Sequence, residues 1–301
     1  MNQKNFEQLN QKKTTSTSVI SLQTRLAWFI LLISLIPLIF VSARDIAQTQ
    51  QALTSSAEAS LRTSAEQTAN SLDTFIQTTL DAISIESQIS VFTDYLSLPE
   101  EQRNGSIEQI RAEDLLNKLS TKDTANIISY ALVDINGNII LDTSKDPSVE
   151  QNESDEAYFP QVRFSSRPIL TEVIYDDNEQ TTITFANRVF GQNDEFAGIL
   201  RVKYDSNVLQ SIVVNSSKSS SNALVLLLDE TYIRLADSRN PSLIQKSVAP
   251  LSPVDYLMAI ENKKFLNAPL QEQTTNFTDF ENALDNASAQ PFFSVDITPN
   301  I

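Results

Sequence analysis

The most constraining feature of the sequence is an apolar run without a single charge at residues 26–43, LAWFILLISLIPLIFVSA. As a helix that rises 1.5 Å per residue, it would span roughly 27 Å, close to the hydrocarbon thickness of a bilayer. Arg25 and Arg44 bracket the run, and Trp28 lies near one end, where an amphipathic ring suits the headgroup layer. Transmembrane helices also tolerate a residue such as Pro37 better than soluble helices do. The sequence therefore predicts a transmembrane helix over residues 26–43.

The residues before this run predict its orientation. Residues 1–25 are polar and carry a net charge of +3, which leaves −19 for the rest of a chain whose total is −16. Positive flanks stay in the cytoplasm, so we expect a cytoplasmic tail, a single pass through the cell inner membrane, and residues 44–301 outside. A cleaved signal peptide is the alternative, because Val41-Ser42-Ala43 resembles a cleavage site, although the polar segment before it is longer than most. In either case the rest of the chain is exported.

Composition excludes several functional classes. The sequence contains no cysteine and no histidine, so thiol nucleophiles, disulfides and serine–histidine catalysis are impossible. Asp and Glu number 38 against 22 Lys and Arg, and no basic cluster interrupts this acidity, so binding to nucleic acid is excluded. We expect no enzyme, no cofactor and no metal.

A long helix is predicted to follow the membrane. No glycine or proline occurs from Leu38 to Leu98, and apolar or small residues recur mostly three, four or seven positions apart. We expect a helix over residues 44–98 whose Ala- and Ser-rich first half pairs with a second subunit in a homodimer. Its bulkier second half would pack on the chain's own domain; packing along its whole length on that domain is the alternative. A short amphipathic helix is expected over residues 106–119.

The periodicity then changes to that of strands. The runs on either side of Asn136-Gly137 are β-prone, and Asn-Gly between such runs is a strong hairpin signal. Asp134, Asn136 and Asn138 resemble a calcium loop, but the glycine follows the second of these residues, whereas that pattern needs it after the third. Further strands are expected at residues 169–175, 181–190 and 198–204, followed by a short helix or an exit segment at residues 206–214.

A second module of the same kind is predicted after a polar link at residues 215–222. The segment ALVLLLDETYIRLADS, at residues 223–238, repeats the strand–turn–strand pattern of YALVDINGNIILDTS. One more strand is expected at residues 291–297. The predicted fold class is therefore α+β: a transmembrane helix continuing into a long helix, then two antiparallel-sheet modules at residues 99–214 and 223–301, the second incomplete.

This order of parts resembles the double Cache family of extracytoplasmic sensor domains, whose modules are PAS-like. The most similar stretches are ALVDINGNIILDTS, DEAYFPQV and AGILRVKYDSNVL. The resemblance covers residues 26–301 and implies a ligand sensor of a chemoreceptor, histidine kinase or nucleotide cyclase. It also implies a second transmembrane helix and an output domain beyond the given sequence, so we expect the chain to be truncated.

The resemblance places a small-molecule site in the first, membrane-distal module. Against the amino-acid-binding branch of the family, Tyr158-Phe159 match the aromatic pair, whereas Glu156 and Lys203 stand where that branch has an arginine and an aspartate. With both charges reversed, binding of amino acids in the family manner is not expected. Because arginine can grip a carboxylate through two hydrogen bonds, an anionic organic acid is the candidate ligand. The candidate binding residues are Tyr130, Tyr158, Phe159, Arg163, Arg167, Thr184 and Lys203.

Three functional hypotheses follow. The first is a receptor sensor in which ligand binding shifts the long helix and signals across the membrane. The second is a membrane-anchored binding or adhesion protein without signalling output. The third is an exported hydrolase that uses carboxylates alone, but acidic pairs are too common in this sequence to identify a site.

Overall fold

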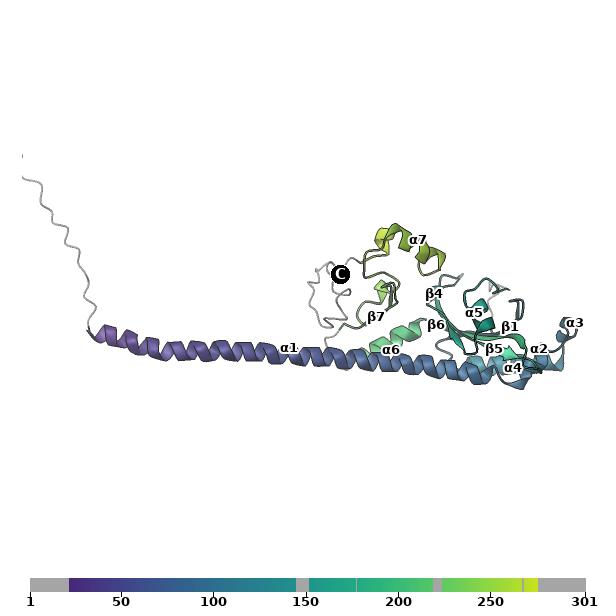
Figure 1. The fold of residues 1–301 in the computed structure, drawn as a ribbon, viewed down its shortest axis with the longest axis horizontal. Helices are drawn as coiled ribbons and strands as arrows, with labels where there is room; N and C mark the ends of the chain where they lie inside the picture. Colours follow the sequence, from purple (N-terminus) through teal and green to yellow (C-terminus); the bar gives the residue numbers. More distant parts are fainter. Residues whose placement is uncertain (1–21, 145–151, 177, 219–223, 267, 276–301) are drawn as a thin grey trace, which may run out of the picture. The chain divides into compact units, whose positions relative to one another are not determined.

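The computed structural model describes residues 22–144, 152–176, 178–218, 224–266 and 268–275, so the tail at 1–21 and the strand predicted at 291–297 lie outside the described residues (Figure 1). The chain divides into two compact units, residues 1–57 and residues 58–301, which are described separately.

The first unit contains the apolar run. It lies within helix α1, which begins at Leu22 and ends, in the second unit, at Glu86. α1 is long and apolar enough to cross a membrane, and none of its most apolar window of 18 residues is buried in the structure. Pro37 lies inside α1 and does not end it.

The helix ends earlier than predicted. The sequence predicted a helix up to Leu98, but α1 ends at Glu86 and a second helix, α2, runs over Ser90–Leu96. Between them Ile89 has extended dihedral angles, and the Asn187 side chain donates to the Ser87 hydroxyl at 2.8 Å. The bend lets α2 bury Phe92, Tyr95 and Leu96 in the core, which a straight helix would carry past the domain. Two more helices follow, α3 (Glu100–Arg103) and α4 (Ile107–Ser120).

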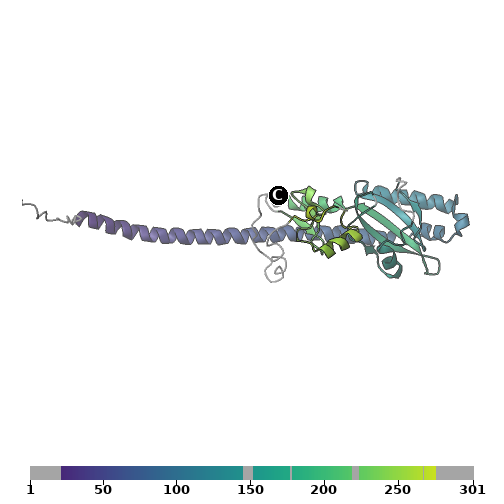
Figure 2. The same cartoon turned by 90° about the horizontal axis from the view of Figure 1, so that it is seen from above.

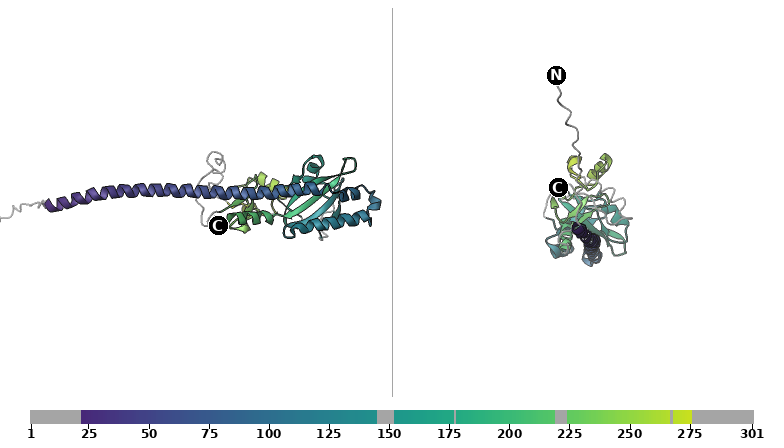
Figure 3. Two further views of the ribbon diagram at one scale, coloured as in Figure 1. Left: turned by 90° about the horizontal axis from the view of Figure 1, so that it is seen from below. Right: turned by 90° about the vertical axis from the view of Figure 1, so that its left-hand side faces the viewer.

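A six-stranded antiparallel sheet forms the centre of the first module. Its strand order is β2-β1-β6-β5-β3, and β4 also pairs with β5. Figure 2 shows the long strands crossing α1 obliquely, and Figure 3 shows α4 beside the end of α1. The strands are β1 (Ile127–Asp134), β2 (Ile139–Asp142), β3 (Ile169–Leu170), β4 (Ile174–Tyr175), β5 (Thr181–Phe190) and β6 (Phe196–Asp205).

One face of the sheet packs on the helices. Phe75 of α1 meets the rings of Phe185 and Tyr204 edge-on, with ring centroids 5.9 and 5.6 Å apart. Burial of such aromatic and aliphatic side chains supplies the main driving force for this packing. The other face is divided. Helix α5 (Tyr158–Phe164) covers an apolar half around Val133 and Ile199, and the other half carries polar side chains.

The predicted Asn-Gly hairpin joins β1 to β2, and its turn recurs in the second module. Asp134 Oδ1 accepts the amide N–H of Asn136 and of Asn138, and Gly137 has a φ of 87°. Asp229 Oδ1 accepts the amides two and four residues further on in the same way, with Tyr232 at a φ of 64°. The sequence repeat therefore reflects a real repeat of turn geometry.

The second module begins after α6 (Asn207–Ser217), so the predicted link at 215–222 starts inside a helix. Ile233, Ala259 and Phe265 form its small core. The predicted α+β architecture is confirmed: a long helix followed by antiparallel-sheet modules. The described elements of the second module are β7 (Leu226–Leu228), β8 (Arg234–Asp237), α7 (Pro253–Glu261) and two short 3₁₀ turns, at Pro241–Leu243 and Leu270–Glu272.

Candidate functional site

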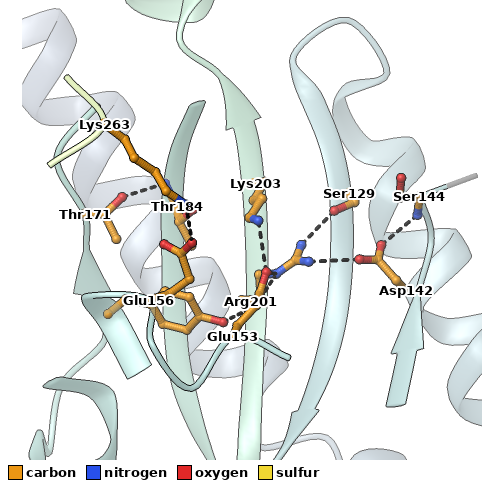
Figure 4. A network of polar contacts seen from close by, with 11 residues as sticks. Ser129, Asp142, Ser144, Glu153, Glu156, Thr171, Thr184, Arg201, Lys203 and Lys263 are labelled. Carbon is orange, nitrogen blue, oxygen red and sulfur yellow. Dashed lines mark hydrogen bonds and ion pairs between the residues drawn. The ribbon is translucent and has the colours of Figure 1, made fainter. Parts of the chain in front are cut away.

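Strand β6 positions the charged centre of the site. Because side chains alternate along a strand, Val202 and Tyr204 join the core on the α1 side. Arg201 and Lys203 therefore project from the opposite face of the sheet, where Arg201 meets Ser129 of β1 and Lys203 meets Glu153 in the segment before α5 (Figure 4).

Arg201 is completely buried, and each of its guanidinium nitrogens has a partner. Its Nε lies 3.0 Å from Glu153 Oε2, its Nη2 lies 2.9 Å from Asp142 Oδ2, and its Nη1 donates to Ser129 Oγ at 2.7 Å. A buried cation is tolerated only when its charge and its hydrogen bonds are matched in this way. Two carboxylates raise the pKa of Arg201 even though burial alone would lower it. Arg201 is therefore a fixed positive charge, and each of its three guanidinium nitrogens already has a partner in the protein.

Glu153 ties this network together. Its carboxylate is 1% exposed and accepts from Arg201, from Lys203 at 2.9 Å, and from the Tyr158 hydroxyl. Burial alone would raise the pKa of Glu153, but Arg201 and Lys203 outweigh burial and lower it to about 2. Glu153 is therefore a permanent carboxylate at physiological pH, and its role is to hold Arg201, Lys203 and Tyr158 in place.

A cavity of about 770 Å³ opens over this polar half of the sheet. Arg201 and Lys203 of β6, Thr182 and Thr184 of β5, and Ser129 of β1 contribute to its lining. Tyr158 and Gln161 of α5 and the strands β3 and β4 supply further walls. The volume lies within the range of small-molecule sites, and the lining combines apolar walls with a few placed polar groups.

The sheet residues that line the cavity form its floor, and Lys203 is the charged group there that a ligand can reach. Its side chain is 22% exposed, whereas those of Arg201 and Glu153 are essentially shielded from water. The Thr184 side chain also lines the cavity, and its amide donates to Thr171 Oγ1 at 3.0 Å. The floor therefore offers one accessible ammonium group among hydroxyl groups, which suits hydrogen bonding to a polar ligand.

One wall comes from the second module. Glu261, Asn262 and Lys263, at the end of α7, line the cavity, and Lys263 Nζ lies 3.1 Å from Glu156 Oε1. Glu156 stands just before α5 and also lines the cavity. Residues more than 100 positions apart in the sequence thus meet at one edge of the site.

The structure brings together three of the seven residues predicted from the sequence. Tyr158, Thr184 and Lys203 line the cavity. Tyr130 lies on the α1 face of the sheet, where its hydroxyl donates to Glu86 at 3.0 Å, and Phe159 packs in the apolar cluster under α5.

The two predicted arginines lie apart from the cavity lining. Arg163 is exposed on α5, with its guanidinium 5.9 Å from the centre of the Phe196 ring, and Arg167 is exposed in the loop that follows. The cationic side chains that line the cavity are instead those of Arg201, Lys203 and Lys263.

Sequence reasoning missed Arg201, Glu153 and the wall formed by Lys263. The sequence of β6 did contain a signal for Arg201. An arginine between Leu200 and Val202 in an apolar strand needs a partner for its charge. Nothing in the sequence linked Glu153 or Lys263 to that strand, because both contacts depend on tertiary folding. Within the part of the chain that the structure describes, no group of three or more acidic side chains is placed to hold a metal ion.

No protein-family model matches the sequence, and no curated protein matches it. Among solved structures, the sensor domain of the histidine kinase DctB from V. cholerae aligns with a TM-score of 0.59 at 18% identity, over 77% of this chain and 83% of that one. The ligand-binding domain of the Campylobacter jejuni chemoreceptor Tlp3, in complex with L-valine, aligns with a TM-score of 0.47 at 16% identity, over 69% of this chain and 81% of that one. The ligand-binding domain of the Pseudomonas fluorescens chemoreceptor CtaA, in complex with L-serine, aligns with a TM-score of 0.44 at 18% identity, over 61% of this chain and 72% of that one.

The first of these likenesses shows the fold. The described chain shares the fold of the DctB sensor domain, so the resemblance to double Cache sensor domains is confirmed at the level of the fold.

Proposed function

We propose that this chain is the extracytoplasmic ligand-sensing part of a transmembrane signal-transduction receptor, and that a small molecule binds in the cavity over β6. The observation that carries the proposal is the cavity itself, with Lys203 presented on a floor held rigid by the buried Arg201–Glu153 pair. A site held this firmly before binding loses little entropy when a ligand enters. The sensor-domain fold supports the same function.

The membrane arrangement is part of the proposal. The apolar start of α1 would cross the inner membrane, with residues 1–25 in the cytoplasm and residues 44–301 outside. The support is the length and apolar character of α1 and the positive charge of the tail. The exposed Leu53 and Leu61 on the Ala- and Ser-rich part of α1 support a homodimer in which this helix is the stalk.

β6 offers a short route from ligand to helix. Lys203 faces the cavity, and its neighbour Tyr204 packs against Phe75 of α1 on the other side of the same strand. A ligand that pulls on Lys203 therefore acts on a strand whose opposite face contacts the helix. Signalling requires the ligand to favour one arrangement of these contacts over another.

The test is a thermal-shift screen of the full chain in detergent micelles. The panel contains the twenty proteinogenic L-amino acids and the C2–C6 dicarboxylates, each at 5 mM. A compound present at about 100 times its Kd should raise the Tm by roughly 5 °C or more.

Two variants decide whether such a compound binds in the cavity. Gln161→Trp places a bulky ring at the exposed cavity wall and should abolish the shift, while Asn117→Trp, an exposed position on α4, should preserve it. A shift that survives Gln161→Trp would place binding elsewhere, and a panel in which no compound shifts the Tm would contradict the proposed binding function of the cavity.

A further inference from the structure

The end of α7 turns two lysines of the second module toward the first. Lys264 N–H donates to Ala259 O at 2.7 Å, and Lys263 N–H donates to Ile260 O at 3.0 Å. These two bonds close the helix in the manner of a Schellman motif, which places Lys263 in the left-handed region with a φ of 56°. Glycine is the residue that this position favours, so a lysine there stores backbone strain. Its side chain forms the contact with Glu156.

Lys263 and Lys264 tie the second module to the rim of the cavity. The carbonyl of Lys263 accepts the amide N–H of Tyr175 at 2.7 Å, along the free edge of β4. The ammonium of Lys264 is nearly buried between Glu172 of the first module, at 2.7 Å, and Asp229 of the second, at 3.1 Å. The ammonium of Lys263 meets Glu156 at the cavity wall.

These contacts differ from the other junction between the modules. At that junction Leu227 and Leu235 pack into the main core, and the Gln210 side chain exchanges two hydrogen bonds of 2.8 Å with the backbone of Asp237. Because burial of apolar surface is favourable in water, side chains packed in this way remain in contact. The junction at the cavity rim is mainly ionic, and the Lys263–Glu156 pair is partly exposed, with 43% and 21% of the two side chains accessible. Pairs of this kind are weak and easily exchanged.

We propose that the cavity is a site shared by both modules, and that Lys263 is a binding residue whose exchange between Glu156 and the ligand controls how firmly the second module docks. An anionic ligand group beside this pair gives Lys263 a further partner and strengthens docking. A cationic group competes for Glu156, weakens the contact of Glu156 with Lys263 and loosens docking. By linkage, docking changes the affinity for the ligand by the same factor. The inference rests on the proposed binding function of the cavity.

The experiment uses charged probes attached inside the cavity of the full chain in detergent micelles. Because the sequence has no cysteine, Gln161→Cys creates a single thiol at the cavity wall. Methanethiosulfonate reagents then attach an ethylsulfonate or an ethylammonium group there, two groups of nearly equal size and opposite charge. Phe164→Cys, 84% exposed on the same helix, carries the same labels as a control outside the cavity.

The readout is hydrogen exchange at the Tyr175 amide, because this amide donates to Lys263 and opens when the second module leaves the rim. The sulfonate should slow this exchange by roughly threefold or more and the ammonium should speed it by a similar factor, as expected for a modest ion pair. Lys263→Gly keeps the carbonyl and the turn but removes the ammonium, and it should abolish the difference between the two labels. Labels on Phe164→Cys should have no effect.

Equal exchange with both labels, or a difference that survives Lys263→Gly, would overturn the shared-site proposal. Because no natural ligand is involved, this failure differs from a failure of the proposed function, which is decided by the compound screen and Gln161→Trp.

Discussion

Arg201 and Glu153 form an ion pair at 3.0 Å whose two side chains are almost entirely removed from water. Arg201 also contacts Asp142 of β2 and Ser129 of β1, and Glu153 also contacts Lys203 of β6. The pair is therefore the centre of a network that joins three strands to the segment before α5. The cavity floor therefore depends on a buried charge cluster.

The first prediction concerns removal of the central cation. Arg201→Met leaves Glu153 and Asp142 facing each other without their shared partner, and breaking a buried pair of this kind costs about 3–5 kcal/mol. The free energy of unfolding, measured with guanidinium chloride on the full chain in micelles, should fall by about that amount. The double variant Arg201→Met/Asp142→Asn removes a carboxylate that has lost Arg201 and keeps Glu153 paired with Lys203, so it should recover part of the loss. A single variant that loses less than about 1 kcal/mol would contradict this view of the floor.

The second prediction concerns pH. The pKa of Glu153 is about 2 in the folded chain, below its ordinary value of 4.5. Because the folded-state pKa is the lower one, the stabilisation from Glu153 is fully present above about pH 4.5 and is lost as the pH falls toward 2. The shift corresponds to about 3 kcal/mol. The Tm measured between pH 7 and pH 3 should therefore fall less steeply in Glu153→Gln than in the unmodified chain. Parallel profiles would show that Glu153 is not held as a carboxylate.

The third prediction concerns the hairpin turn that supports Glu153. Gly137 has a φ of 87°, and a Cβ there would stand 2.6 Å from the Ser154 amide nitrogen. Its carbonyl also accepts the Glu153 amide at 2.7 Å. Gly137→Ala should therefore destabilise the chain by about 2 kcal/mol or more, and Gly105→Ala, at a φ of 76° in open space, by about 1 kcal/mol. Equal losses in the two variants would show that the contact with Ser154 does not matter.

The fourth prediction concerns strain in the turn between β4 and β5. Asp176 accepts the amides of Asn178 and Gln180 in the same manner as Asp134, and Glu179 is exposed with a φ of 60°. Glu179→Gly should relieve that strain and raise the free energy of unfolding by up to about 1 kcal/mol. Glu230→Gly makes the same change of charge in the turn after β7, at a position without a positive φ, and should lower stability instead. A loss in both variants would contradict the assignment of strain.

The fifth prediction separates the two faces of the sheet. Tyr130 donates to Glu86 on the α1 face, away from the cavity. Tyr130→Phe should lower stability by about 1 kcal/mol and leave the binding of any compound found in the screen unchanged. Thr184→Val removes a hydroxyl from the cavity lining and should weaken that binding. Weaker binding in Tyr130→Phe would instead show that Tyr130 contributes to the binding site.

The repeating pattern of the sequence determined most of the architecture. The charge-free run, the stretch without glycine or proline, and the Asn-Gly turn each depend on near neighbours in the chain, and they predicted α1, the β1–β2 hairpin and its repeat. The end of α1 at Glu86 was not predicted, because no local helix breaker occurs there. At the bend, the Ser87 hydroxyl accepts a hydrogen bond from Asn187, which lies 100 residues away.

The candidate site was decided by tertiary structure. Composition and resemblance selected Tyr158, Thr184 and Lys203, but on residue type alone they also selected Tyr130, Phe159, Arg163 and Arg167, which lie outside the cavity lining. Which face a side chain occupies depends on strand register, and a shift of one residue exchanges the two faces. The partners of Arg201 and Lys203 come from a distant segment, and Lys263 comes from another module. The sequence by itself determined which elements form, and the pairing of β6 with its neighbours decided which side chains share the cavity.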